Sequence, residues 1–214
     1  MAKLDIQELL ENLEPEERGG AFITTSKQEM YSHLVKFDDN IGSPAKYRDL
    51  IDLLYMANEN TEFNFLINSS GGGMSASMAI IEAIKGSDGA VRAIITGECH
   101  SAASLIAFNC HEIIVTDSAH ALIHTASYGA GGNVHLVQSH VDFYTKMINK
   151  ILDETYAGFL SEAELSDVKR GIEKWYDADE IRARLLNRKA YLQAQADAAT
   201  APVKKPRTSR SKAK

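Results

Sequence analysis

Short apolar runs rich in β-branched residues alternate with helix-like segments through the middle of the chain. The strand-like runs span 31–37, 63–67, 91–96, 112–116 and 121–124, and helical patterns follow from Ser43, from Met74 and over 101–109. Such alternation is typical of βαβ units, which build a mostly parallel sheet with reactive groups at the carboxyl ends of its strands. The sequence therefore predicts an α/β fold.

The composition fits one folded domain with tails. The chain has 214 residues, of which 44% are hydrophobic, and this is ample for a core. No apolar stretch reaches the length of about 18 residues that spans a membrane, and no basic segment followed by an apolar one opens the chain. We expect a cytoplasmic protein without a membrane partner, in which Cys99 and Cys110 are free thiols.

The two ends of the chain differ from its body. Residues 5–8 read as a capping box before an amphipathic pattern, which predicts a helical extension over 1–20. Residues 193–214 are expected to form a flexible basic tail, because six Lys and Arg residues and no acid lie within 204–214. Without these six charges the net charge falls from −6 to −12. An acidic body makes nucleic acid an unlikely partner, except through the tail.

Ser101 is a candidate nucleophile. The strand-like run 91–96 stops at Gly97, and an apolar helical pattern begins directly after Ser101. A serine at a helix start lies near unpaired backbone N–H groups, which favour developing negative charge. The alternative is an ordinary helix cap, since serine is common at that position.

Two further motifs accompany this serine. The first is the glycine turn at 71–73, which follows the strand-like run 63–67. The second is His124, which closes the strand-like run 121–124. Together, the segments 68–72, 97–102 and 122–125 resemble the N-S-P-G-G, G-M-A-A-S-M and M-I-H-Q motifs of ClpP, the proteolytic subunit of the Clp protease. The resemblance extends over about residues 21–186, and the ordered set of three motifs is far more specific than any one of them.

The resemblance implies a ClpP/crotonase-like fold of repeated ββα units, with a mostly parallel sheet and a protruding handle helix. The protease domain would span 21–192. The glycine-rich segment 128–133 and the helix after it match the handle through which two rings of subunits meet. The apolar stripe of that helix, from Val134 to Ile151, reads either as core or as an oligomer interface, and the resemblance favours the interface.

The resemblance also assigns catalytic roles. Ser101 would be the nucleophile and His124 the base that a serine hydroxyl needs at neutral pH. The third position, the acid that accepts from the other histidine nitrogen, falls on Glu173 where the family has Asp. Because glutamate is one methylene longer, its backbone would have to lie about 1.5 Å further back. Asp177 is the alternative acid. The backbone N–H groups of Gly72 and Ala102 would form the oxyanion hole.

Other histidines carry weaker signals. His100 replaces a small residue before the nucleophile, so its ring either points into the sheet or competes for the Ser101 proton. His120 and His124 have metal-type spacing, but no cysteine or acidic partner completes a site. We expect neither a metal nor a cofactor.

The function implied is a serine endopeptidase that cleaves unfolded or assembly-related polypeptides inside a homo-oligomeric ring, either a heptamer or a double ring. A separate AAA+ unfoldase or bacteriophage capsid proteins, as in phage head maturation, are the candidate partners. Residues 71–73 lack the Gly-Lys-Ser/Thr of a phosphate-binding loop, so any ATP use belongs to another chain. The alternatives are a catalytically silent ClpP-like scaffold and a crotonase-fold acyl-CoA enzyme.

Overall fold

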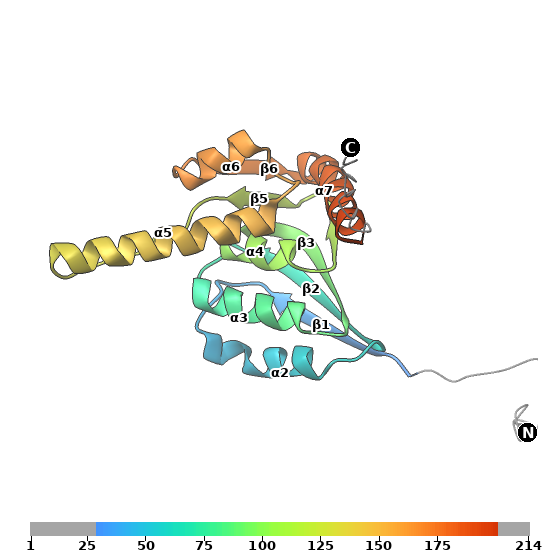
Figure 1. Cartoon of the computed structure of the whole chain (residues 1–214). Helices are drawn as coiled ribbons and strands as arrows, with labels where there is room; N and C mark the ends of the chain where they lie inside the picture. Colours follow the sequence, from blue (N-terminus) through green and yellow to red (C-terminus); the bar gives the residue numbers. More distant parts are fainter. Residues whose placement is uncertain (1–28, 201–214) are drawn as a thin grey trace, which may run out of the picture.

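The apolar runs of the sequence become strands of one sheet in the computed structural model, which describes residues 29–200 (Figure 1). The strand order is β1-β2-β3-β5-β6, and β4 pairs with the first half of β3. All pairings are parallel except that of β5 with β6. The predicted α/β class with a mostly parallel sheet is therefore confirmed. The strands are β1 (Tyr31–Phe37), β2 (Thr61–Ser69), β3 (Ala90–His100), β4 (Glu112–Val115), β5 (His120–Ile123) and β6 (Lys174–Asp177).

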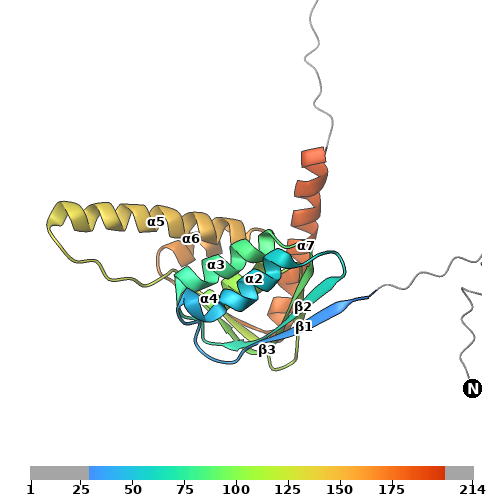
Figure 2. The same cartoon turned by 90° about the horizontal axis from the view of Figure 1, so that it is seen from below.

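Three helices cover one face of this sheet, and the 3₁₀ helix η2 (Pro44–Tyr47) precedes them. They are α2 (Arg48–Met56), α3 (Met74–Lys85) and α4 (Ala102–Phe108), which lie together over the strands in Figure 2. Phe63, Phe65 and Ile67 alternate along β2 and are fully buried on the helical side. The alternation follows from the period of two in a strand, which sends every second side chain to the same face.

The opposite face of the sheet carries a row of polar side chains. Ser32 donates to Glu62 at 2.6 Å, and Arg92 bridges Asn64 at 2.9 Å and Glu112 at 2.6 Å. This row crosses β1, β2, β3 and β4. These strands are therefore buried on the helical face, while the opposite face carries this polar row together with apolar side chains, of which Leu34 and Ile114 are exposed.

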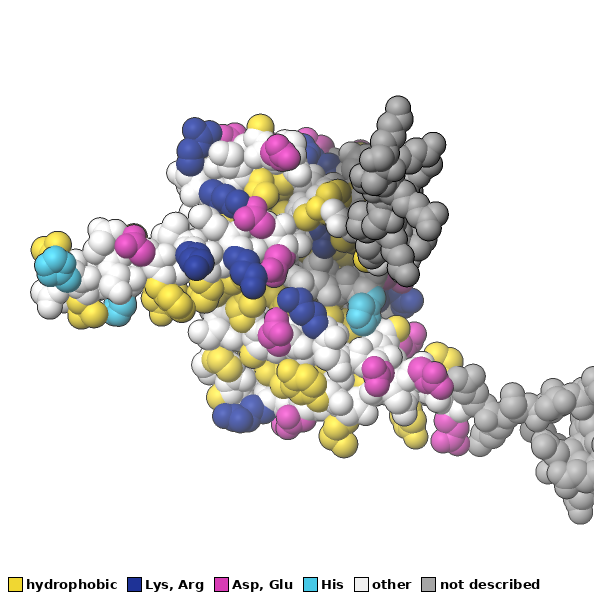
Figure 3. Space-filling model, viewed as in Figure 1, with side chains coloured by type: hydrophobic (Ala, Val, Ile, Leu, Met, Phe, Trp, Pro, Cys, Tyr) yellow, Lys and Arg dark blue, Asp and Glu magenta, His cyan; other side chains and the backbone are white. Residues whose placement is uncertain are grey.

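Helix α5 (Val134–Tyr156) extends well beyond the body of the molecule (Figures 1 and 2). Asn133 caps it by accepting from the Leu136 amide at 3.0 Å. Its last turns supply Ile148, Ile151 and Tyr156 to the core. Its outer part is exposed, and hydrophobic side chains are visible on it in Figure 3. The outer half of the apolar stripe on α5 is therefore not part of the hydrophobic core of this subunit.

The C-terminal part consists of α6 (Glu162–Lys169), β6 and α7 (Ala178–Thr200). The capping boxes expected at Ser161 and Asp177 are both formed. Residues 193–200, placed by the sequence in the flexible tail, continue α7 as an exposed helix. The predicted helical extension over 1–20 and the basic residues of 204–214 lie outside the described residues.

Candidate active site

Ser101 lies at the turn between β3 and α4 in a backbone conformation that most residues avoid. Its φ of 53° is the only positive φ of a non-glycine residue within 29–200. Its amide donates to the Leu122 carbonyl at 2.9 Å, and its carbonyl accepts from the Ser104 hydroxyl at 2.7 Å. The Ser101 side chain makes no capping hydrogen bond, so it is not an ordinary helix cap. Such strained backbone persists only where its surroundings hold it, and it concentrates at functional sites.

The glycine turn after β2 lies directly against this serine. Gly71 has a φ of 95°, and a side chain there would place its Cβ 2.6 Å from the His100 carbonyl and 2.7 Å from the Ser101 Cβ. Gly73 donates to the Ile41 carbonyl at 2.7 Å, which fixes the far side of the turn. Only glycine allows this approach of two backbones, so the turn and the nucleophile turn form one unit.

Two backbone amides of this unit are available for a ligand. Among the hydrogen bonds of residues 29–200, neither the Gly72 nor the Ala102 amide donates one. Both residues line the cavity that also contains Ser101. Unpaired amides beside a hydroxyl can bind a developing oxyanion, as the sequence resemblance implies for these two positions.

The cavity beside Ser101 has a volume of about 350 Å³ and also contains His124. The Ser101 hydroxyl and the His124 ring form no hydrogen bond with each other. Such contacts are often loose before substrate binds. The rest of the wall is predominantly apolar: Met74, Leu105, Ala126, Ile148, Ile151 and Leu152.

Glu173 faces the histidine from the position just before the neighbouring strand β6. The antiparallel register of β5 and β6 pairs Ile123 with Lys174, which puts His124 and Glu173 side by side. The Glu173 Oε1 lies 3.9 Å from the His124 Nδ1, which is too long for a hydrogen bond and within reach of an ion pair. The structure thus brings Ser101, His124 and Glu173 to one edge of the sheet.

Asp177, the alternative acid, lies elsewhere. The same register pairs it with His120, three positions before Ile123. Its Oδ1 accepts from the Glu180 amide at 2.9 Å and its own amide donates to the Glu180 carboxylate at 3.1 Å. Asp177 therefore caps α7 and does not face His124.

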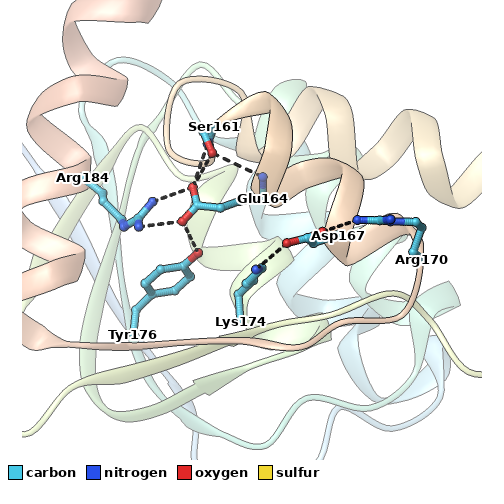
Figure 4. A network of polar contacts seen from close by, with 7 residues as sticks. All are labelled: Ser161, Glu164, Asp167, Arg170, Lys174, Tyr176 and Arg184. Carbon is cyan, nitrogen blue, oxygen red and sulfur yellow. Dashed lines mark hydrogen bonds and ion pairs between the residues drawn. The ribbon is translucent and has the colours of Figure 1, made fainter.

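A polar network holds the chain on both sides of Glu173 (Figure 4). Glu164 binds Arg184 at 2.7 Å and accepts from the Ser161 amide, and Asp167 accepts from Lys174 at 2.8 Å. The hydrogen bond from Arg184 is the largest cause that lowers the pKa of Glu164 to about 2, and burial opposes it. Lys174 follows Glu173 directly, so this network anchors the segment that carries the acid.

His100 points into the sheet and does not line the cavity. Its side chain contacts Trp175 edge-to-face at 5.2 Å between ring centroids, and His120 at 5.0 Å. Burial lowers the pKa of His100, and its Nε2 is buried without a hydrogen-bond partner among the described residues. The first of the two sequence interpretations is therefore correct, and nothing brings this ring to the Ser101 proton.

The cysteines and the remaining histidines form no metal site in the part of the chain that the structure describes. Cys99 and Cys110 are unpaired, and burial raises the pKa of Cys99 to about 12. Within 29–200, no group of three or more His, Cys, Asp or Glu residues could hold a metal ion. A buried thiol with a raised pKa is a poor nucleophile.

Two supporting contacts have little signal in the sequence. The Ser104 hydroxyl is 2.6 Å from the Tyr156 hydroxyl, deep below Ser101, and the Trp175 indole N–H donates to Glu173 at 3.3 Å. Ser104 lies three residues after Ser101 and so on the same side of the helix, and this spacing is the one local indication that Ser104 supports the site. Trp175 follows Glu173 by two residues, which in an extended segment places both on one side. Tyr156 comes from a distant helix and could not be found from spacing.

Comparison with known proteins gives one family. The family model described as Clp protease matches residues 25–183, about three quarters of the chain. A search of curated proteins finds no match. Within residues 29–200, no helix is both long and apolar enough to cross a membrane.

Proposed function

The chain belongs to the Clp protease family, and from this premise we propose that it is a serine endopeptidase with Ser101, His124 and Glu173 as its catalytic residues. The family membership makes it a ClpP-type peptidase at the level of the family. The observation that carries the residue assignment is the shared cavity of Ser101 and His124, with Glu173 behind the histidine.

In the proposed acylation step, the Ser101 Oγ attacks the scissile carbonyl carbon while its proton passes to the His124 Nε2. The amides of Gly72 and Ala102 stabilise the oxyanion. Collapse of the tetrahedral intermediate breaks the C–N bond, and His124 gives the proton to the leaving amine. Water then attacks the acyl ester, with His124 again as base, and regenerates the Ser101 hydroxyl.

Glu173 has two tasks in this proposal. It faces the His124 Nδ1 and so favours the tautomer whose Nε2 can accept the Ser101 proton. Its negative charge also stabilises the imidazolium that forms. The distance of 3.9 Å has to shorten in the transition state for the full effect, which loose geometry before substrate binding allows.

The cavity favours an extended polypeptide with an apolar side chain next to the scissile bond. Its wall is largely aliphatic, and burial of such a side chain contributes about 1.5–3 kcal/mol. We propose flexible or unfolded polypeptides as substrates, and a homo-oligomeric ring as the working form. The exposed apolar side chains on the outer half of α5 support an interface there: Val134, Leu136, Phe143 and Tyr144.

An AAA+ unfoldase and capsid assembly proteins are the two proposed classes of partner. The acyl-CoA alternative gains no support, because the family match is to Clp protease. A catalytically silent scaffold is the competing function, since it would keep the same fold with Glu173 in place of Asp.

Hydrolysis of a fluorogenic peptide by Ser101→Ala tests the proposal. We expect activity to be abolished while assembly is unchanged, because the change removes one oxygen and little packing. Ser166→Ala is the matched control, since Ser166 is exposed on α6 and does not line the cavity, so this variant should keep its activity. Peptide hydrolysis by a correctly assembled Ser101→Ala variant would overturn the assignment, and an inactive wild-type protein would favour the scaffold.

A further inference from the structure

Trp175 makes the only side-chain hydrogen bond that the Glu173 carboxylate accepts within residues 29–200. Its indole Nε1 donates to the Glu173 Oε2 at 3.3 Å, while the other oxygen faces the His124 Nδ1. We infer that Trp175 is a positioning residue, which holds one carboxylate oxygen so that the other stays directed at the histidine. This inference rests on the proposed function of Glu173.

The carboxylate needs such a restraint because packing does not supply one. The Glu173 side chain is 52% exposed, and a glutamate loses about 1.5–2 kcal/mol of rotamer entropy when it is fixed. It is also one methylene longer than the aspartate of the family, which adds a rotatable bond between backbone and charge. A donor on the far oxygen limits these rotations without occupying the oxygen that faces His124.

Trp175 is itself held by the sheet. The register pairs His100 with Leu122 and Leu122 with Trp175, so these three residues form one row across β3, β5 and β6. The His100 ring meets the indole edge-to-face, with an interplanar angle of 77°. His100 is buried, with an exposed fraction of 8%. The row therefore connects the strand that leads into Ser101 with the indole that binds the acid.

This arrangement gives the unusual His100 a role. Its ring does not line the cavity of Ser101, but it contacts the indole edge-to-face. Aromatic pairs of this geometry are worth about 0.5–1.5 kcal/mol beyond their buried area. A small residue at this position would leave the indole without this contact.

The kinetic test is a double-mutant cycle between Trp175 and Glu173. Trp175→Phe keeps a ring against His100 and removes the indole donor. We expect kcat for peptide hydrolysis to fall about three- to tenfold with KM unchanged, the size of one partly exposed hydrogen bond to a charged group. In a Glu173→Ala background the same substitution should have no further effect on the residual rate, because there is no carboxylate left to orient.

The spectroscopic test leaves Trp175 in place and does not depend on activity. Trp175 is the only tryptophan of the chain, so its indole N–H gives a single ¹⁵N–¹H correlation. Glu173→Ala should shift that proton upfield through loss of the carboxylate acceptor. The control Glu98→Ala changes another carboxylate near His100, and should leave the hydrogen-bond shift in place.

The outcomes separate the inference from the function on which it rests. A normal kcat in Trp175→Phe together with a slow Glu173→Ala would overturn the positioning role and leave the protease assignment standing. An equal loss from Trp175→Phe in both backgrounds would also overturn it, since the effect would then be one of packing. Full activity of Glu173→Ala would overturn both this inference and the role of Glu173, and activity of Ser101→Ala would refute the proposed function itself.

Discussion

Glu164→Gln removes the charge that joins α6 to α7 next to the site. The Glu164 carboxylate lies 2.7 Å from the Arg184 guanidinium, and its pKa falls from the ordinary 4.5 to about 2, chiefly through the hydrogen bond from Arg184. One pKa unit corresponds to about 1.4 kcal/mol, and the side chain is 23% exposed, so solvent screens part of the interaction. We expect the free energy of unfolding to fall by about 2–3 kcal/mol at neutral pH.

The sign of the pH dependence follows from the direction of this shift. A carboxyl group whose pKa is lower in the folded state stabilises the fold fully above its unfolded pKa. This contribution is lost as the pH falls from 4.5 toward 2, because Glu164 then becomes protonated in the folded state as well. The difference between wild type and Glu164→Gln should therefore shrink across that window.

Urea unfolding followed by circular dichroism at pH 7, 4.5 and 3 measures this difference. Protein concentration must be the same throughout, since assembly contributes to apparent stability. Glu162→Gln is the matched control: it lies on the same helical turn without an ion pair in the described chain, and should change stability by less than about 0.5 kcal/mol. A difference for Glu164→Gln that stays constant from pH 7 to pH 3, or an equal loss in the control, would show that the ionised Glu164 does not stabilise the fold through Arg184.

Three further predictions concern the site. Glu173→Gln should lower turnover by a few powers of ten with the fold intact, and Glu173→Asp should keep partial activity. Asp177→Asn should lower turnover much less, because asparagine caps a helix about as well as aspartate. Steady-state peptide hydrolysis measures all three, and an inactive Asp177→Asn beside an active Glu173→Gln would reverse the assignment of the acid. Gly71→Ala should lower both melting temperature and activity because its Cβ meets the His100 carbonyl, whereas Gly129→Ala, in open space, should change neither. Burial lowers the pKa of His100, so stability should fall as the pH drops below about 6.5, and His100→Leu should reduce that slope in pH-dependent urea unfolding.

Local patterns in the sequence predict most of the fold. The strand at Tyr31–Phe37 has the expected bounds, and the capping boxes at Ser161 and Asp177 mark the starts of α6 and α7. These features depend on residues close in sequence, because hydrophobic periodicity determines the strand and capping hydrogen bonds determine where each helix begins. The meeting of Ser101 and His124 also follows, because both residues lie at carboxyl ends of neighbouring parallel strands.

Other features depend on neighbours that a single sequence does not reveal. Helix α7 reaches Thr200, so the first residues of the predicted flexible tail, 193–200, are helical; this stretch is rich in alanine, which is the best helix former. The His100 ring packs against His120 and against Trp175, which lies two strands away in the sheet. The contact of Ser104 with Tyr156 joins helices that pack only in the folded molecule.

Covalent labelling with a fluorophosphonate tests whether Ser101 is a nucleophile activated by His124. The reagent forms an Oγ–phosphorus bond with loss of fluoride only where a serine is activated by a base. We expect one label per subunit, mapped to Ser101 by peptide mass spectrometry and absent in His124→Ala. An assembled wild-type protein that takes no label, or that takes it on a serine other than Ser101, would show that Ser101 is not the activated nucleophile.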